Sequence, residues 1–252
     1  MLIEFSGKRV VVAGAARGIG RAIAVELARR GAEVHACDIL VDEVRAYAES
    51  VGGGAIRPAW VDVADARSVE GVVAAAADGA GAVDVLVYVA GGVRGQSKRP
   101  LEEVEPEEFR EIVEANLTGA FVFARAVAPG MKKAGRGRIV TISSRAGLAT
   151  SLTGIQSYAA AKHGQVGLVK QLAQELGPFG ITVNAVCPGM IDTELTREHA
   201  TPERLAELAA EYPVPRLGTP REVADLICFA ASEAAGYITG AAFDINGGDL
   251  MM

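Results

Sequence analysis

The chain has 252 residues, of which half are hydrophobic and 22% are charged, with 25 Lys and Arg against 31 Asp and Glu. The net charge of −6 leaves no basic excess to neutralise phosphates, so we expect no binding to nucleic acid. We also expect no membrane span, because no apolar run approaches the roughly 20 residues that one needs, and no secretory signal, because no basic stretch precedes an apolar one at the start.

Short apolar runs alternate with helical stretches along the chain. The runs are continuous rather than alternating, which is typical of strands covered on both faces. They lie near residues 10–12, 34–37, 56–61, 83–89, 139–142, 181–187 and 241–245, and helices are expected near 18–30, 41–51, 67–78, 106–131, 155–177, 194–211 and 220–232. This order predicts one doubly wound α/β domain over residues 1–252, with a mostly or wholly parallel sheet of about seven strands and helices on both faces.

A glycine-rich turn follows the first strand and leads into the first helix. Its sequence is Ala13-Gly14-Ala15-Ala16-Arg17-Gly18-Ile19-Gly20. Such a turn suits a pyrophosphate, because glycines let the backbone come close and the helix dipole favours negative charge. The spacing differs from the common G-x-G-x-x-G of Rossmann-type domains, so by itself it supports a helix-packing turn equally well.

Asp38 ends the second strand, 18 residues after Gly20. An acidic residue near this spacing suits the hydroxyls of an adenosine ribose and would repel a 2′-phosphate. We therefore favour NAD over NADP as the cofactor. Arg17 is a signal in the other direction, since a cation in the turn would attract a 2′-phosphate. Asp62, after the third strand, suits either the adenine region or a surface turn.

Tyr158 and Lys162 share one face of a later helix, because residues four apart are neighbours on a helix. Val169 and Leu176 continue this stripe, so it points inward, and a buried lysine needs a partner. An adjacent ammonium would lower the tyrosine pKa from its usual value near 10 and fit the phenol for acid–base chemistry. In isolation the same spacing is more typical of a surface pair.

Two further polar residues lie where a site is expected. Ser144 follows the fifth strand, and doubly wound sheets bind ligands at the carboxyl ends of their strands. Asn116 shares a helical stripe with Ile112 and Phe123, so it must find hydrogen-bond partners in the core. Either a structural or a catalytic asparagine satisfies this pattern.

The three cysteines, Cys37, Cys187 and Cys228, are far apart in apolar runs. This is typical of buried thiols in a reduced compartment, so we expect a cytoplasmic protein. Neither they nor the histidines show the spacing of a metal site, and no metal is predicted.

Together and in order, these residues resemble the short-chain dehydrogenase/reductase family, in its single-domain branch, across essentially the whole chain. The resemblance implies a catalytic set of Asn116, Ser144, Tyr158 and Lys162. It also implies a set of residues that contact the dinucleotide: Gly14, Arg17, Gly18, Ile19, Gly20, Asp38, Asp62, Val63, Ala90, Gly91, Tyr158, Lys162, Pro188, Gly189, Ile191 and Thr193.

The resemblance further implies roles for the catalytic residues in a hydride transfer between carbon and C4 of a nicotinamide. Tyr158 would be the acid/base, and Lys162 would lower its pKa and hold the nicotinamide ribose. Ser144 would polarise the substrate oxygen, with Ser143 as a minor alternative. Asn116 would hold a water that links Lys162 to solvent. A homo-oligomer, either a tetramer or a dimer, is also implied.

The sequence departs from the family pattern at two strand ends. Ala13 stands where the family usually has threonine, and Tyr88-Val89 stand where it has two asparagines. We therefore expect a polar side-chain contact between these central strands to be missing or replaced.

Two enzymatic functions agree with these features. The first is an NAD-dependent dehydrogenase of a small alcohol, polyol or sugar, acting on a secondary hydroxyl or its ketone. The alternative is an NADPH-dependent reductase of 3-oxoacyl thioesters, which Arg17 favours. A nucleotide-sensing protein without chemistry is disfavoured by the complete catalytic set. The substrate is expected to contact residues 93–98, 145–156 and an insertion at about 194–218, which we predict to be a mobile lid.

Overall fold

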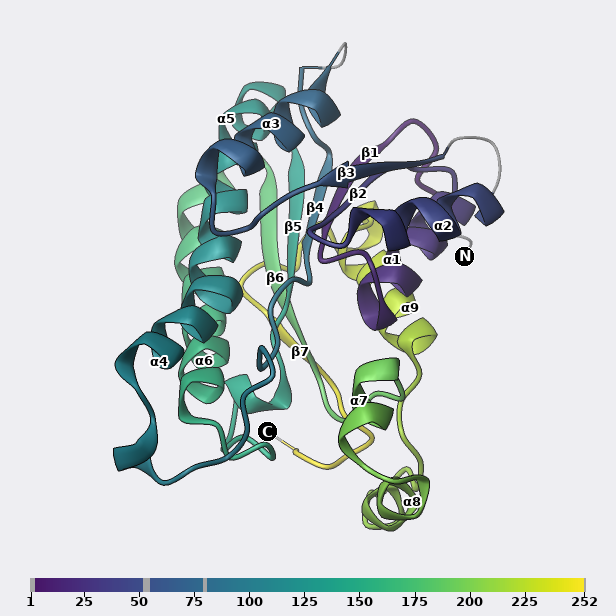
Figure 1. The fold of residues 1–252 in the computed structure, drawn as a ribbon. Helices are drawn as coiled ribbons and strands as arrows, with labels where there is room; N and C mark the ends of the chain where they lie inside the picture. The colour runs from purple at the N-terminus through teal and green to yellow at the C-terminus, as the bar shows by residue number, and fades with distance from the viewer. Residues whose placement is uncertain (1–2, 52–54, 79–80, 252) are drawn as a thin grey trace.

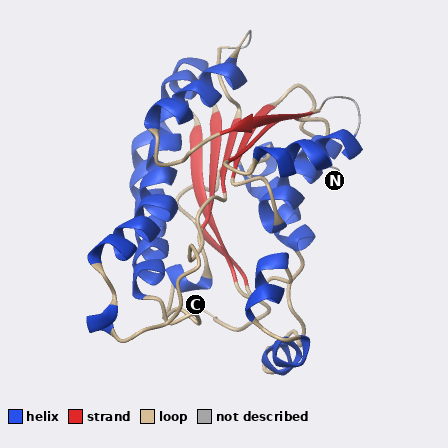
Figure 2. Cartoon of the chain, in the orientation of Figure 1, coloured by secondary structure: helices blue, strands red, loops and turns tan. Residues whose placement is uncertain are grey.

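The computed structural model describes residues 3–51, 55–78 and 81–251, and these residues contain one parallel sheet (Figures 1 and 2). The strand order is β3-β2-β1-β4-β5-β6-β7, which confirms the predicted doubly wound fold. The strands are β1 (Arg9–Ala13), β2 (Glu33–Asp38), β3 (Ile56–Trp60), β4 (Val85–Tyr88), β5 (Gly137–Ile142), β6 (Ile181–Pro188) and β7 (Ala242–Ile245).

Helices cover both faces of this sheet (Figure 1). On one face lie α1 (Gly18–Arg29), α2 (Val41–Val51) and α9 (Pro220–Ala230), and on the other lie α3 (Ala66–Ala77), α5 (Gly119–Ala134) and α6 (Gln156–Leu176). The helices α4 (Pro106–Val113), α7 (Glu194–His199) and α8 (Pro202–Ala210) lie toward the carboxyl ends of the strands. No helix in the described ranges is long and apolar enough to cross a membrane.

The two faces of the sheet belong to two separate apolar cores. Val10 and Val12 of β1 pack in the core that contains Ile23 of α1. Val11, between them in sequence, packs instead in the core that contains Phe123 of α5. Successive side chains of a strand point to opposite faces, so a continuous apolar run is what a strand covered on both faces requires.

One predicted helical stretch is interrupted by a π-turn, and another, for which the sequence allows one or two helices, forms two. The stretch predicted at 106–131 contains a short π-helix, η2 (Glu114–Thr118), between α4 and α5. The stretch predicted at 194–211 is two helices, because Ala200 is extended and α8 begins anew at Pro202. A π-turn carries an extra residue, which changes the phase of the helical stripe, and helical periodicity alone does not reveal it.

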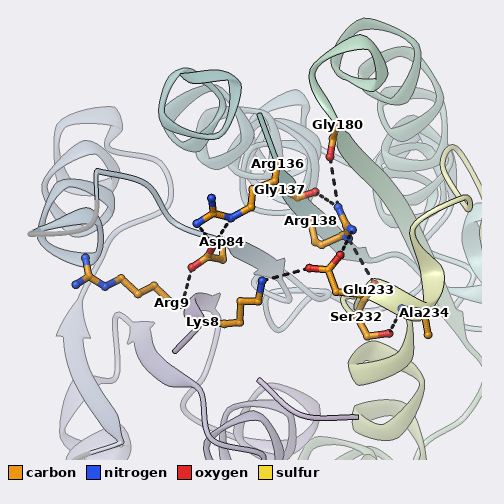
Figure 3. Close-up of polar contacts among 10 residues, drawn as sticks. All are labelled: Lys8, Arg9, Asp84, Arg136, Gly137, Arg138, Gly180, Ser232, Glu233 and Ala234. Atoms are coloured by element: carbon orange, nitrogen blue, oxygen red, sulfur yellow. Dashed lines mark hydrogen bonds and ion pairs between the residues drawn. The ribbon is translucent and has the colours of Figure 1, made fainter. Parts of the chain in front are cut away.

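The amino ends of the strands are joined by a network of charged side chains (Figure 3). Asp84 accepts hydrogen bonds from the backbone N–H of Arg9 at 3.0 Å and from Nε of Arg136 at 3.2 Å. Arg138 contacts Glu233 at 3.1 Å, and Lys8 reaches the same carboxylate at 3.2 Å. This network connects the start of β1, β4 and β5 to the segment after α9, on the side away from the predicted site.

Candidate active site

The glycine turn after β1 lies against the end of β4. A side chain at Gly14 would meet the backbone of Ala90 at 2.5 Å, and one at Gly20 would overlap the carbonyl of Gly14. Gly14 and Gly18 also have positive φ angles of 86° and 50°, a region that favours glycine. The turn therefore depends on these glycines for its shape.

The N-terminus of α1 can receive an anion. Its N-cap residue, Arg17, makes no side-chain cap to the helix, and no acidic residue lies in the first turn. The first amides of a helix need acceptors, and a phosphate is a suitable one. The turn has the shape that a pyrophosphate needs, with the carboxylate of Glu194 beside Gly18, and the pyrophosphate site stays a prediction.

Asp38 lies beside this turn at the end of β2. Its two carboxylate oxygens accept the backbone N–H groups of Ala16 and Leu40, each at 3.0 Å. Arg17 turns toward α2, where its guanidinium makes a bidentate contact with Glu43, 2.5 Å from Nε to Oε2. Glu43 raises the pKa of Arg17 and so keeps it charged. Arg17, which the sequence suggested as a partner for a 2′-phosphate, is therefore paired with the carboxylate of Glu43.

The other predicted cofactor residues lie around the same edge of the sheet. Thr193 packs beside Gly18, since a Cβ there would be 3.2 Å from its methyl carbon. Asp62 accepts the N–H of Ala64 at 3.0 Å in a turn, and Gly91 lies directly against Asn116. The rest lie on the turn, on the loops that follow the strands or at the end of β6: Ile19, Val63, Ala90, Pro188, Gly189 and Ile191.

Ser144 lies beside Tyr158 at the end of β5. Burial raises the pKa of Tyr158, and the neighbouring Ser144 hydroxyl opposes this effect. The direction is opposite to the lowering that the sequence suggested, because burial favours the neutral phenol. Ser143 is buried, and its hydroxyl donates to the carbonyl of Lys162 at 3.0 Å. Of the two serines, Ser144 is therefore the one beside the tyrosine.

Lys162 is 3% exposed and carries a cation into the interior. Its Nζ donates to the carbonyl of Ile142 at 2.9 Å and to Oε1 of Gln165 at 3.2 Å. It lies 5.7 Å from the centre of the Tyr158 ring. Burial lowers the pKa of Lys162 to about 7, because a low-dielectric site disfavours the ammonium.

Asn116 lies on η2 and is fully buried. Its Oδ1 accepts the N–H of Gly92 at 3.0 Å, and its Nδ2 donates to the carbonyls of Gly92 and Ile112, both at 2.9 Å. The side chain therefore fixes the loop after β4 against α4.

Tyr88 accounts for one of the departures from the family pattern. This side chain is buried at the end of β4, and its hydroxyl donates to the carbonyl of Ala115 on η2 at 2.6 Å. A Cβ at Gly119 would overlap the hydroxyl. At the strand ends, the carbonyl of Ala13 accepts the N–H groups of Val89 and Ala90 at 2.8 and 3.0 Å. These backbone hydrogen bonds and the Tyr88 hydroxyl thus replace the expected polar side-chain contact between the strands.

The segments predicted to meet the substrate surround this edge. All five of their arginines are ion-paired: Arg94 with Glu111, Arg145 with Asp249, Arg197 with Asp192, Arg204 with Glu207 and Arg216 with Glu222. Arg145 and Asp249 approach to 2.6 Å and connect the C-terminal segment to the loop after β5. The described residues contain no group of three or more His, Cys, Asp or Glu arranged for a metal ion.

Tyr88 and Gln165 contact this site but were not predicted from the sequence. A signal for Gln165 was present, because it lies three residues after Lys162 and seven after Tyr158, on the same inward stripe. A polar residue on that stripe needs a partner. Tyr88 offered a weaker signal, a phenol within an apolar strand.

Comparison with known proteins places these features in a family. A family model described as enoyl-(acyl carrier protein) reductase matches residues 14–249. The chain is 40% identical over 250 residues to the 3-oxoacyl-[acyl-carrier-protein] reductase FabG of Escherichia coli K12, covering 99% of this chain and 100% of that one.

Two solved structures are similar throughout. A short-chain type dehydrogenase/reductase from Mycobacterium marinum aligns with a TM-score of 0.91 and 34% identity, over 98% of this chain and 97% of that chain. A 3-oxoacyl-[acyl-carrier protein] reductase with bound NAD from Brucella melitensis aligns with a TM-score of 0.89 and 37% identity, over 100% and 95%.

Proposed function

Since the chain belongs to the short-chain dehydrogenase/reductase family of NAD(P)-dependent oxidoreductases, we propose that it interconverts a 3-oxoacyl thioester and the corresponding 3-hydroxyacyl thioester. The observation that carries the chemistry is the Ser144–Tyr158 pair above the buried Lys162, at the strand ends beside the glycine turn. The thioester substrate is supported by the likeness to reductases of this type along nearly the whole chain. It replaces our first expectation of a small alcohol, polyol or sugar.

Each catalytic side chain has one task in the reduction. When bound, the reduced dinucleotide supplies the hydride from C4 of its nicotinamide to the carbonyl carbon. Ser144 donates a hydrogen bond to the carbonyl oxygen and holds it beside Tyr158. Tyr158 gives its phenolic proton to that oxygen as the carbon–oxygen double bond becomes a hydroxyl. Because burial raises its pKa, the phenol holds this proton at neutral pH.

Lys162 and Asn116 support this proton transfer. The ammonium of Lys162 stabilises the phenolate that remains on Tyr158 after the proton has left. Asn116 fixes the loop after β4 through Gly92, so the site has a defined wall on that side.

The cofactor that these residues favour is NAD rather than NADP. Asp38 places a carboxylate beside the turn, where it would repel a 2′-phosphate. The opposing cation, Arg17, is held by both carboxylate oxygens of Glu43. The bound NAD of the Brucella melitensis structure agrees with this preference.

The substrate proposal is tested by following the oxidation of NADH with acetoacetyl-CoA, and in parallel with a panel of ketones, sugars and hydroxy acids. We expect the thioester to give the highest kcat/KM. A sugar or simple ketone that clearly exceeds it would overturn the thioester assignment while leaving the family intact.

The cofactor proposal is tested by replacing the carboxylate that rejects the 2′-phosphate. In Asp38→Ala the ratio of kcat/KM for NADH to that for NADPH should fall by roughly tenfold or more, the factor equivalent to about 1.4 kcal/mol. Asp42→Ala, on the exposed start of α2, is the control. An unchanged ratio in Asp38→Ala would remove Asp38 from cofactor selection.

A further inference from the structure

Gln165 is a fully buried primary amide three residues after Lys162 on α6. Its Oε1 accepts from Nζ of Lys162 at 3.2 Å, and its Nε2 donates to the backbone carbonyl of Asn116 at 2.6 Å. An ammonium can only donate and a carbonyl can only accept. The reversed amide would place two donors together and two acceptors together, so the neighbours determine its orientation.

The partner of this amide is itself fixed by other side chains. The carbonyl of Asn116 follows that of Ala115, which accepts the hydroxyl of Tyr88 at 2.6 Å. These two carbonyls lie within the π-turn η2, where the regular hydrogen-bond pattern of an α-helix is broken. Tyr88 therefore contacts η2 from β4, and Gln165 contacts it from α6.

The ammonium of Lys162 is thereby held between two fixed acceptors. One is the carbonyl of Ile142 at 2.9 Å, at the end of β5, and the other is Oε1 of Gln165. Among the described residues, no carboxylate forms an ion pair with this ammonium. The amide dipole of Gln165 is therefore a principal stabiliser of its charge, because buried charges need hydrogen-bond partners.

We propose that Gln165 is a positioning residue that fixes the ammonium of Lys162 by joining it to the backbone of η2. The proposal rests on the proposed function for the role of Lys162 beneath Tyr158. It also revises the expected relay, in which a water held by Asn116 links Lys162 to solvent. An amide holds its two N–H protons and does not pass one on as water does, so Gln165 does not serve as a proton path from Lys162 to Asn116.

Two variants separate positioning from packing. Gln165→Leu keeps a similar volume but removes both hydrogen bonds, so Lys162 loses an acceptor that favours its charged form. Gln165→Glu keeps an acceptor and adds a negative charge beside the ammonium. We expect the Lys162 pKa to fall in the first variant and to rise in the second, each by about one unit.

The pKa can be read without any substrate from the 13C shift of the Lys162 side-chain ε-carbon in selectively labelled protein. Gln171→Leu, which replaces an exposed glutamine of the same helix, is the matched control and should leave the Lys162 titration unchanged. Shifts of opposite sign in the two Gln165 variants are the result that a merely structural role would not produce. A Lys162 titration that matches wild type in Gln165→Leu would overturn the proposal, even if the melting temperature has fallen.

Turnover provides the second readout. With acetoacetyl-CoA, kcat of Gln165→Leu should fall by about tenfold, and its pH profile should move with the pKa of Lys162 while KM changes little. If wild type does not reduce the thioester, the proposed function fails while the NMR titration still decides the role of Gln165. If the thioester is reduced and the titration is unmoved, only the inference about Gln165 fails.

Discussion

The two ends of the parallel sheet hold their buried charges in opposite ways. At the amino end, the carboxylate of Asp84 is only 11% exposed and is paired with Arg136, and Arg138 is 12% exposed and is paired with Glu233 (Figure 3). At the carboxyl end, Lys162 is more deeply buried but is held by a carbonyl and an amide.

The difference indicates what each end is for. A buried charge is costly, and pairing with an opposite charge reduces that cost. The amino end satisfies this requirement and behaves as a structural connection between strands. At the carboxyl end the pKa of Lys162 falls to about 7, and strongly shifted groups of this kind gather at functional sites.

The largest expected effect concerns chemistry alone. Tyr158→Phe removes the transferable proton and should lower kcat by roughly 10²–10⁴-fold, while NADH binding and the free energy of unfolding stay close to wild type. Turnover is measured by NADH absorbance and binding by NADH fluorescence. Turnover like that of wild type would refute the acid/base role of Tyr158.

The second prediction concerns the cost of the buried lysine. Because its pKa is about 7 in the folded chain and 10.5 is its ordinary value, the unfolded chain binds more protons between these limits. The contribution of Lys162 to the free energy of unfolding therefore increases as pH rises through this window, by up to about 1.4 kcal/mol per pH unit.

Urea denaturation of wild type and Lys162→Met between pH 7 and 9 measures this contribution. The difference in unfolding free energy between the two proteins should move with pH in favour of wild type, and comparing them cancels the titration of other groups. A difference that is constant with pH would show that Lys162 is as protonated in the folded chain as in the unfolded one, so that its pKa is not lowered.

The smallest effect is expected at the amino end, and on stability alone. Asp84→Ala leaves the N–H of Arg9 without its acceptor, which should cost about 1–3 kcal/mol of unfolding free energy. Lys8→Ala removes only an exposed ion pair with Glu233 and should cost less than about 1 kcal/mol. Both variants should keep wild-type kcat. A large loss of turnover in either would show that the amino end of the sheet is not purely structural.

Much of the fold was predictable because its signals are local. The apolar runs predicted near 10–12 and 181–187 correspond to β1 and β6, since strands covered on both faces need continuous apolar residues. The π-turn at Glu114–Thr118 was not predictable in this way. Its stability comes from Tyr88 and Gln165, which lie on other elements and contact it only in the folded chain.

The sequence by itself determined the doubly wound order, the glycine turn, and which polar residues face inward, because periodicity and glycine placement are properties of neighbouring residues. Tertiary structure decided the partners of those residues. It paired the guanidinium of Arg17 with Glu43 instead of leaving it free to meet a 2′-phosphate. It also joined Lys162 to the backbone of Asn116 through the amide of Gln165. Such pairings depend on the packing of α6 against η2 and of the glycine turn beside α2, which no local pattern specifies.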